Sequence, residues 1–273
     1  MLTRKVAFQG EQGAYSEMAT LQYFQNVNPV PMKSFQDVFD SLEAGDVDFA
    51  VIPIENSIEG SVSETYDLLL RTNMFVAGEI YQRVRHCLIT NKRTNSIIKS
   101  VYSHPQALAQ CRTYLQKKGL EPIPTYDTAG AVKMIKERKI IHGAAIASRR
   151  AAEIYQMKIL DEGIEDKKNN FTRFLIMSKT ERKTTCDDKT SIIFSIAHTP
   201  GALFGILKEF ASRKINLTKI ESRPTKEAPW EYNFYVDFEG HSNEQNITDA
   251  LQTIKKKSSF FKILGSYKKG EFH

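Results

Sequence analysis

The C-terminal part of the chain carries the feature that most restricts its fold, an ordered run of short apolar strands and amphipathic helices. The six predicted elements are Ser191–Ala197, Gly201–Arg213, Asn216–Ser222, Tyr232–Glu239, Asn243–Lys256 and Phe261–Ser266. The first, third, fourth and sixth are strands and the other two are helices, which is the βαββαβ order of a ferredoxin-like unit. Thr199 and Pro200 predict a capped start for its first helix. We therefore expect a separate domain over residues 191–273.

Strands and helices alternate through the preceding part of the chain, and this order is typical of α/β folds with parallel sheets. Two extended stretches at 75–80 and 83–90, and a late strand at 171–178, predict that the chain passes twice between two lobes. We expect one lobe to hold residues 1–80 with 168–180, and the other to hold residues 81–167. Together they form one domain over 1–180, and residues 181–190, rich in charge and Thr, are the predicted linker. A cleft between two such lobes is a common place for a small ligand.

The 273 residues include 41% hydrophobic and 26% charged side chains, which is ordinary for a globular protein. The net charge of +6 suits a small anionic substrate. The basic clusters at 255–257 and 268–269 indicate solvated faces rather than a nucleic-acid track. Cys87, Cys111 and Cys186 fit neither a zinc site nor a disulfide framework, and no leader or membrane span is evident. We therefore expect a cytoplasmic protein that binds no metal, nucleic acid or membrane.

A polar cluster, Asn169–Arg173, directly precedes the apolar run Phe174–Met177. The run predicts a buried strand, and loops at strand ends are where open α/β sheets place ligand contacts. Arg173 can pair a carboxylate, and Thr172 can donate or accept a hydrogen bond. Adjacent residues of a strand face opposite sides, so Thr172 and Arg173 share a cleft only if the strand begins after them. A surface turn before the strand would explain the same pattern.

Further polar loops follow other predicted strands. Glu55, Asn56 and Ser57 offer an acid, an amide and a hydroxyl, although a plain loop would explain them equally well. Gln106 and Gln110 lie one turn apart on a predicted helix that runs to Gly119. Ser16 is predicted to cap a helix that runs to about Phe24. Further helix starts are predicted at Ser34, Asp127 and His104, and we interpret His104 as a turn residue. Gly10 and Gly13 resemble a nucleotide fingerprint only faintly, because the third glycine is missing.

Taken together, these segments resemble the prephenate dehydratase family over nearly the whole chain. The segments that carry the resemblance are Gly10–Ser16, Pro53–Val62, Ser103–Cys111, Asp127–Ala129, Ala144–Ser148 and Asn169–Phe174, together with Gly201–Phe204 and Glu221–Pro224 of the C-terminal unit. Each is weak alone and specific in combination. The resemblance implies a two-lobed, periplasmic-binding-protein-like catalytic domain followed by an ACT regulatory domain. Bifunctional members of the family carry an N-terminal chorismate mutase helix unit, and this sequence has no room for one before Lys5, so the chain resembles the form with dehydratase activity alone. Gly130 stands where many relatives carry Ala.

The resemblance implies a hydro-lyase that converts prephenate to phenylpyruvate, water and carbon dioxide in phenylalanine biosynthesis, without a cofactor. Thr172 is the expected catalytic residue, donating to or orienting the departing hydroxyl. The expected substrate-binding residues are Glu55, Asn56, Ser57, Ser103, Gln106, Gln110, Thr128, Asn170, Arg173 and Phe174. Glu55 is awkward beside a dianion, and we leave open whether it is protonated, orients Arg173 or faces away.

The resemblance also implies that phenylalanine acts as an effector between ACT units of neighbouring subunits in a homodimer or homotetramer. The expected effector-binding residues are Gly201, Ala202, Leu203, Asn216, Leu217, Glu221, Ser222 and Arg223. A surface ion pair between Glu221 and Arg223 is the plainer interpretation of those two charges.

Two other functions fit the same residues. Arogenate dehydratase catalyses the same elimination on a substrate that carries an ammonium in place of the ketone, and the sequence does not separate the two. A non-catalytic sensor of anionic metabolites would share the two-lobed architecture, although the Asn-x-Thr-Arg-Phe cluster argues against it. A nucleic-acid-binding regulator is a distant third, because no such motif is evident.

Overall fold

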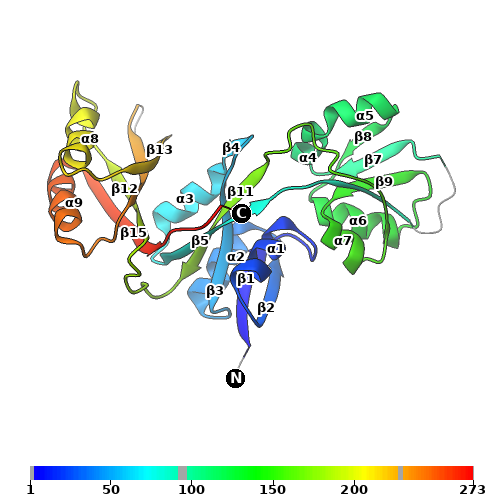
Figure 1. Cartoon of the computed structure of the whole chain (residues 1–273), viewed down its shortest axis with the longest axis horizontal. Coiled ribbons are helices and arrows are strands. Elements are labelled where there is room, and N and C mark those ends of the chain that lie inside the picture. Colours follow the sequence, from blue (N-terminus) through cyan, green and yellow to red (C-terminus); the bar gives the residue numbers. More distant parts are fainter. Residues whose placement is uncertain (1–2, 92–96, 227–229, 273) are drawn as a thin grey trace. The chain divides into compact units, whose positions relative to one another are not determined.

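The computed structural model describes residues 3–91, 97–226 and 230–272. The chain divides into two compact units. The first unit comprises residues 1–66 and 80–174, and the second comprises residues 67–79 and 175–273. Both are mixed α/β structures (Figure 1), which confirms the predicted fold class.

The first sheet has the strand order β2-β1-β3-β11-β5, with the short β4 beside β3. Its strands are β1 (Arg4–Gln9), β2 (Val27–Met32), β3 (Phe49–Asn56), β4 (Gly60–Ser61), β5 (Phe75–Arg83) and β11 (Phe171–Ser178), and its helices are α1 (Tyr15–Tyr23), α2 (Phe35–Ala44) and α3 (Ser63–Arg71). β1 runs parallel to both β2 and β3. The sheet is therefore of the predicted parallel type where β1 meets its neighbours. β3 and β11 are adjacent, and each carries residues of one of the two polar clusters predicted from the sequence.

The second sheet, in the same unit, has the order β10-β6-β9-β7-β8. Its strands are β6 (Cys87–Thr90), β7 (Ser100–Ser103), β8 (Glu121–Pro124), β9 (Gly143–Ala147) and β10 (Lys158–Glu162), and its helices are α4 (Pro105–Gln110), α5 (Arg112–Lys118), α6 (Thr128–Glu137) and α7 (Arg149–Ile154). β9 is buried along its whole length. A Cβ on Gly143 would lie 2.7 Å from a side-chain carbon of Ile140, so this small-residue strand packs too closely for a larger residue at its start.

Local sequence signals set several helix ends as predicted. Ser34 and Asp37 form a capping box at α2, which ends at Gly45 in the left-handed conformation. Asp127 caps α6 by accepting hydrogen bonds from the backbone N–H groups of Ala129 and Gly130.

Three predicted helix boundaries are wrong. α1 begins at Tyr15 rather than being capped by Ser16, because the Glu17 carboxylate accepts the Gly13 N–H at 2.8 Å and satisfies the loop before the helix. The helix predicted from Pro105 to Gly119 breaks at Cys111 into α4 and α5. Thr199 does not cap the next helix, whose N-cap is Gly201 at φ 83°.

The second unit contains the predicted ferredoxin-like domain. Its sheet has the order β13-β14-β12-β15, in which each neighbouring pair is antiparallel. Its elements are β12 (Asp188–Ser195), α8 (Ala202–Ser212), β13 (Leu217–Pro224), β14 (Tyr232–Glu239), α9 (Gln245–Lys257) and β15 (Phe260–Lys268). β12 begins at Asp188, inside the stretch predicted as a linker. In the core of the ferredoxin-like domain, Phe194, Phe210 and Phe238 pack with aliphatic side chains from both helices.

The 67–79 segment is tied to this domain by polar contacts within the second unit. Lys189 Nζ lies 2.7 Å from Glu79 Oε1, with both side chains almost fully buried. Lys262 Nζ donates to the Leu69 and Leu70 carbonyls at 3.0 and 3.1 Å, which satisfies the C-terminal end of α3. Burial lowers the pKa of Lys262.

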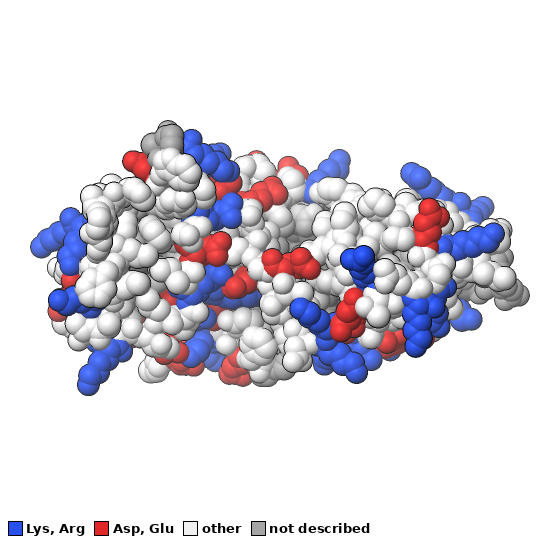
Figure 2. All heavy atoms as spheres, turned by 90° about the horizontal axis from the view of Figure 1, so that it is seen from above, with Lys and Arg blue, Asp and Glu red and all other residues white. Residues whose placement is uncertain are grey.

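Charged side chains of both signs are interspersed on the face that Figure 2 shows, where no continuous basic stripe is visible. No helix in the described part of the chain is long and apolar enough to cross a membrane.

Candidate active site

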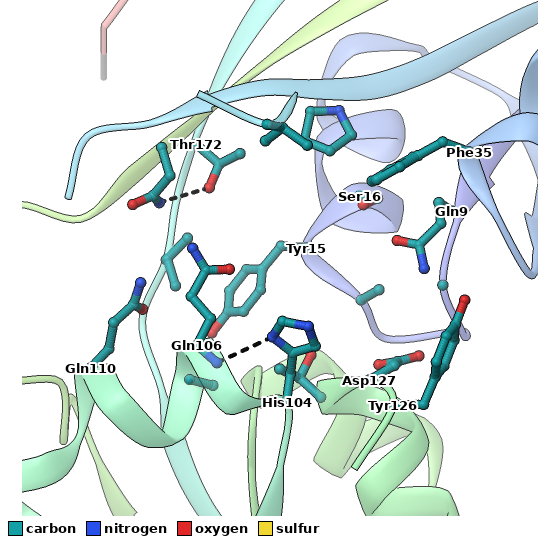
Figure 3. A pocket seen from close by; sticks show the side chains of 18 of the residues that line it. Gln9, Tyr15, Ser16, Phe35, His104, Gln106, Gln110, Tyr126, Asp127 and Thr172 are labelled. Atoms are coloured by element: carbon teal, nitrogen blue, oxygen red, sulfur yellow. Dashed lines mark hydrogen bonds between the residues drawn. The ribbon is translucent and has the colours of Figure 1, made fainter. Parts of the chain in front are cut away.

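A cavity of about 480 Å³ lies in the first unit (Figure 3) and is lined by strand residues of the first sheet and by helix and loop residues that flank strands of the second. Its lining residues are Gln9, Gly10, Ala14, Tyr15, Ser16, Ser34, Phe35, Pro53, Asn56, Val62, Glu64, Val84, His86, His104, Gln106, Ala107, Gln110, Tyr126, Asp127, Thr128 and Thr172. We call it the pocket. Its volume is that of a site for a small molecule.

Four helix N-termini contribute to the pocket lining. Tyr15 opens α1, Phe35 opens α2, Gln106 lies in the first turn of α4, and Thr128 opens α6. The N-terminal end of a helix carries unpaired N–H groups and a partial positive charge. Their convergence makes the pocket suitable for an anionic ligand.

The charged side chains of the lining are acidic: no Lys or Arg is found among the described residues that line the pocket, whereas Glu64 and Asp127 are. Asp127 accepts three backbone hydrogen bonds, from Ala129 and Gly130 at 2.6 and 3.1 Å through Oδ1 and from Glu11 at 3.1 Å through Oδ2. Its charge is therefore compensated by peptide dipoles, and Glu64, which is exposed, is the acid that a ligand would meet.

Hydrogen-bonded amides link the two polar clusters predicted from the sequence. Asn56 Nδ2 donates to Asn170 Oδ1 at 2.8 Å and to Thr172 Oγ1 at 3.0 Å, and lies 3.2 Å from the Phe171 carbonyl. Asn170 Nδ2 in turn donates to Gln110 Oε1 at 2.8 Å. We call Asn56, Asn170 and Gln110 the amide chain. Its members are buried, so each polar atom needs its partner.

The orientation of Asn56 determines what the Thr172 hydroxyl can do. Asn56 Oδ1 accepts the backbone N–H groups of Ile58 and Glu59 at 2.9 and 3.1 Å. A backbone N–H can only donate, so Asn56 must present its NH₂ group to Thr172. Thr172 Oγ1 is then an acceptor toward Asn56 and keeps its own proton for a ligand in the pocket.

His86 and Tyr15 stand at the other end of the amide chain. His86 Nε2 lies 3.1 Å from Gln110 Oε1, and His86 Nδ1 lies 3.2 Å from the Tyr15 hydroxyl. The Tyr15 hydroxyl donates to the Arg85 carbonyl at 2.7 Å. Burial lowers the pKa of His86 and raises the pKa of Tyr15, so both side chains are neutral near pH 7.

The structure brings together part of the predicted substrate-binding set. Asn56, Gln106, Gln110, Thr128 and Thr172 line the pocket, and the two glutamines lie one turn apart as predicted. Asn170 is fully buried behind the lining and holds Asn56 and Gln110.

The other predicted site residues lie outside the pocket lining for identifiable reasons. Ser103 is fully buried, and its hydroxyl donates to the Ile146 carbonyl at 2.6 Å. Ser57 closes the loop against β11 through Asn169 O and Phe171 N. β11 begins at Phe171, so Thr172 faces the pocket while Arg173, its neighbour on the strand, is buried on the other side. Glu55 and Phe174 also do not line the pocket.

Sequence reasoning missed several lining residues. Tyr15 lies in the Gly10–Ser16 segment but was not proposed as a site residue, and His86 lies in none of the quoted segments; their interaction joins positions 71 residues apart. His104, interpreted as a turn residue, is the N-cap of α4: its Nδ1 accepts the Gln106 N–H at 3.2 Å, and burial lowers the pKa of His104. Packing explains the glycine at position 13 of the faint nucleotide fingerprint. Gly13, at φ 91°, lies so close to α7 that a Cβ would be 2.6 Å from Ala151 Cα.

A second, smaller cavity of about 110 Å³ lies in the ferredoxin-like domain. It is lined by Ile196, Ala197, His198, Thr199, Ala202, Leu203, Trp230, Tyr232 and Phe234. Of the predicted effector residues, Ala202 and Leu203 line it and Gly201 caps the adjoining helix. Asn216, Leu217, Glu221, Ser222 and Arg223 do not line it. Arg223 Nε lies 3.9 Å from Asp67 Oδ1, so this arginine forms an ion pair with Asp67.

Among the described residues, no group of three or more His, Cys, Asp or Glu side chains is arranged to hold a metal ion. The pocket instead offers hydroxyl and amide donors, helix N-termini and neutral imidazoles. Together with the ferredoxin-like domain, this defines an α/β protein with a small-molecule site suited to an anion and a separate ferredoxin-like domain.

Comparison with known proteins identifies the family. The prephenate dehydratase family model matches residues 6–182, and the ACT domain model matches residues 190–255. The chain therefore belongs to the prephenate dehydratase family and carries a C-terminal ACT domain, as the sequence predicted.

Two similar proteins are named as dehydratases, and a third similar structure carries a different description. Arogenate dehydratase/prephenate dehydratase 2, chloroplastic, of Arabidopsis thaliana is 44% identical over 275 residues, which cover 96% of this chain and 72% of the relative. A prephenate dehydratase from Arthrobacter aurescens, solved in complex with L-Phe, superposes with a TM-score of 0.88 at 31% identity, covering 97% of this chain and 89% of the other. A structure described as GqqA, a novel type of quorum quenching acylase, superposes with the same TM-score of 0.88 at 32% identity, covering 97% and 98%.

Proposed function

We propose that this chain is a prephenate dehydratase that converts prephenate to phenylpyruvate, with Thr172 as the donor to the leaving hydroxyl. The observation that carries the proposal is the direction of the Asn56–Thr172 hydrogen bond, which leaves the Thr172 proton available at the pocket. Family membership supplies the reaction class, a hydro-lyase, and the convergence of four helix N-termini suits a dianionic substrate.

The proposed step is a concerted or near-concerted elimination. Prephenate loses its ring carboxylate as carbon dioxide, the electron pair moves through the ring, and the C4 hydroxyl departs with one added proton as water. The Thr172 hydroxyl stabilises the developing hydroxide by hydrogen bonding, and the proton comes ultimately from solvent, because a Thr hydroxyl is a weak acid. The ring becomes aromatic, so positioning and one donor are what the site has to supply, and such a donor contributes on the order of 10²–10⁴ in rate.

The remaining predicted contacts stay part of this proposal. Gln106, Gln110 and Thr128 are proposed to bind the substrate, and Asn56 and Asn170 to orient Thr172 and Gln110. Glu55, Ser57, Ser103, Arg173 and Phe174 are proposed to support the site from behind the lining.

Arogenate is the second candidate substrate, because the Arabidopsis relative is named for both activities. Glu64 is the observation that favours it: an exposed carboxylate in the lining could pair with the ammonium of arogenate and would repel the second charge of prephenate. Amide hydrolysis, suggested by the acylase structure, is less well supported. Within the described residues, the pocket hydroxyl that hydrogen-bonds an imidazole is that of Tyr15, whereas Thr172 bonds an amide.

L-phenylalanine is the proposed effector, acting through the ACT domain with Gly201, Ala202 and Leu203 nearest to the smaller cavity. We also propose a homodimer or homotetramer formed through the ACT and catalytic domains. β13 supports this, because it is an edge strand with alternating exposed positions and an exposed Ile220. The proposed setting is a reducing cytoplasm, consistent with three free cysteines.

Turnover of prephenate by the purified chain, followed as phenylpyruvate in alkali with and without phenylalanine, tests the proposal. Turnover that phenylalanine suppresses supports both the enzyme and the effector site, and turnover without suppression retains only the enzyme. Turnover of arogenate alone would transfer the assignment to arogenate. The absence of turnover with both substrates, combined with tight binding, would overturn the enzyme in favour of a sensor.

A further inference from the structure

The amide chain has one direction, and that direction starts from the backbone. Asn56 Oδ1 is held by two backbone N–H groups, so its Nδ2 faces Asn170 and makes Asn170 Oδ1 an acceptor. Asn170 must then present its own NH₂ group to Gln110 Oε1. Each amide is oriented by the preceding one, and no member can flip without placing two donors or two acceptors against each other.

The chain ends at His86, and its direction fixes the tautomer of that residue. Gln110 Oε1 offers only lone pairs, so the imidazole nitrogen 3.1 Å away must carry a proton, and this nitrogen is Nε2. In the neutral ring Nδ1 is then an acceptor 3.2 Å from the Tyr15 oxygen, and the single Tyr15 proton is shared between Nδ1 and the Arg85 carbonyl, which lies closer at 2.7 Å. The rings of His86 and Tyr15 pack edge to face at 5.6 Å, which holds the imidazole in place.

We propose that His86 is a positioning residue for the elimination, which acts by holding Gln110 so that its NH₂ group serves the substrate. With two donors on Oε1, the Gln110 NH₂ group is left for Glu59 Oε1, a long contact of 3.5 Å, and for an anion in the pocket. A flipped Gln110 would present its carbonyl oxygen to a carboxylate and its NH₂ group to two other donors. The inference rests on the proposed function for its effect on rate.

A matched pair of variants separates positioning from packing and from proton transfer. The Gln side chain in His86→Gln places its NH₂ near the position of the imidazole Nε2, whereas the shorter Asn in His86→Asn places it near Nδ1. We expect His86→Gln to retain at least a third of the wild-type kcat/KM for prephenate and to keep the wild-type pH profile. We expect His86→Asn to lose about tenfold or more, with an unfolding midpoint close to that of His86→Gln.

A double-mutant cycle tests whether the effect passes through Gln110. His86→Asn should cost less than about twofold when it is added to Gln110→Ala. Equal losses in the Asn and Gln variants, a loss of one limb of the pH profile in His86→Gln, or additive losses with Gln110→Ala would each overturn the positioning role.

A readout without substrate distinguishes this inference from the proposed function. Nitrogen-15 NMR of the wild-type imidazole side chain should show the proton of His86 on Nε2 near neutral pH. A proton on Nδ1 alone would overturn the inference whatever the activity. If the wild type turns over neither prephenate nor arogenate, the proposed function fails, and an Nε2 proton would still support the geometry.

Discussion

Replacing Asn56 with Asp changes one heavy atom and reverses a hydrogen bond. The two backbone N–H groups that hold Oδ1 keep their acceptor, so the second carboxylate oxygen takes the place of Nδ2. This oxygen then faces Thr172 Oγ1 and Asn170 Oδ1, at the 3.0 and 2.8 Å where a donor stood before. Thr172 can relieve the mismatch only by turning its own proton onto the carboxylate, which withdraws that proton from the pocket.

The magnitude follows from the burial of the site. Asn56 is 7% exposed, so water cannot replace the lost donor. A hydrogen bond to a charged group contributes about 1.5–3 kcal/mol, and losing one at the developing hydroxide corresponds to a factor of about 10–150 in rate. We expect kcat for prephenate to fall about 100-fold in Asn56→Asp.

The assay is phenylpyruvate formation across pH, with Asn56→Ala as the control. Ala removes the donor but leaves the Thr172 proton free, so we expect a higher kcat than in the Asp variant. Burial should raise the pKa of the new carboxyl, and its protonated form regains an O–H donor, so Asn56→Asp should recover part of its activity as the pH is lowered toward about 5. A kcat for Asn56→Asp within threefold of wild type, or above that of Asn56→Ala, would refute the hydrogen-bond direction.

Four further outcomes are expected. Thr172→Val should lower kcat by at least about tenfold with KM within about threefold, whereas Thr172→Ser, which keeps the hydroxyl, should lose less; a larger loss in Thr172→Ser than in Thr172→Val would place the role in the methyl group, which Val retains. Glu64→Gln should raise the ratio of kcat/KM for prephenate over arogenate by up to about fivefold, since two unit charges in water interact by about 1 kcal/mol at close range, and an unchanged ratio would remove Glu64 from substrate choice. Lys189→Met should lower the free energy of unfolding by about 3–5 kcal/mol, because it leaves the buried Glu79 carboxylate without its ammonium partner. Urea unfolding should show that most of the lost free energy is restored in a double variant that also carries Glu79→Leu. Burial lowers the pKa of His86 below its ordinary value of 6.5, so below that pH the unfolded chain binds a proton that the folded chain does not. The free energy of unfolding should therefore fall as the pH drops through about 6.5. In urea unfolding measured across pH, His86→Gln should flatten this fall.

The elements predicted correctly are those specified by signals close together in the sequence. The ferredoxin-like domain follows from the spacing of apolar residues in six consecutive segments, and its sheet order matches that expectation. Ser34 and Asp127 begin helices as predicted, because a capping side chain reaches N–H groups only two or three residues ahead. The polar cluster before Phe174 predicted Thr172 at the end of a buried strand, and Thr172 lines the pocket.

The prediction was less complete where a residue's role depends on distant partners. α1 starts before the predicted cap because Glu17 is engaged by Gly13 and by Arg150, 133 residues away. Arg173 has the chemistry of a carboxylate ligand, but the register of β11 buries it on the side opposite to Thr172. Neither Tyr15, which lies in the Gly10–Ser16 segment, nor His86, which lies in none of the quoted segments, was proposed as a site residue.

The sequence by itself determined the two fold types, the family and the side chains capable of the chemistry, because periodicity, caps and motif spacing are properties of neighbouring residues. The tertiary structure decided which atom of each side chain faces the ligand. Asn56 and Thr172 are 116 residues apart, and the direction of the bond between them depends on two backbone N–H groups that only the folded loop presents to Asn56. A hydrogen bond has a donor and an acceptor, so the direction of this chain of amides, and with it the availability of the Thr172 proton, exists only after β3, β11 and α4 have come together.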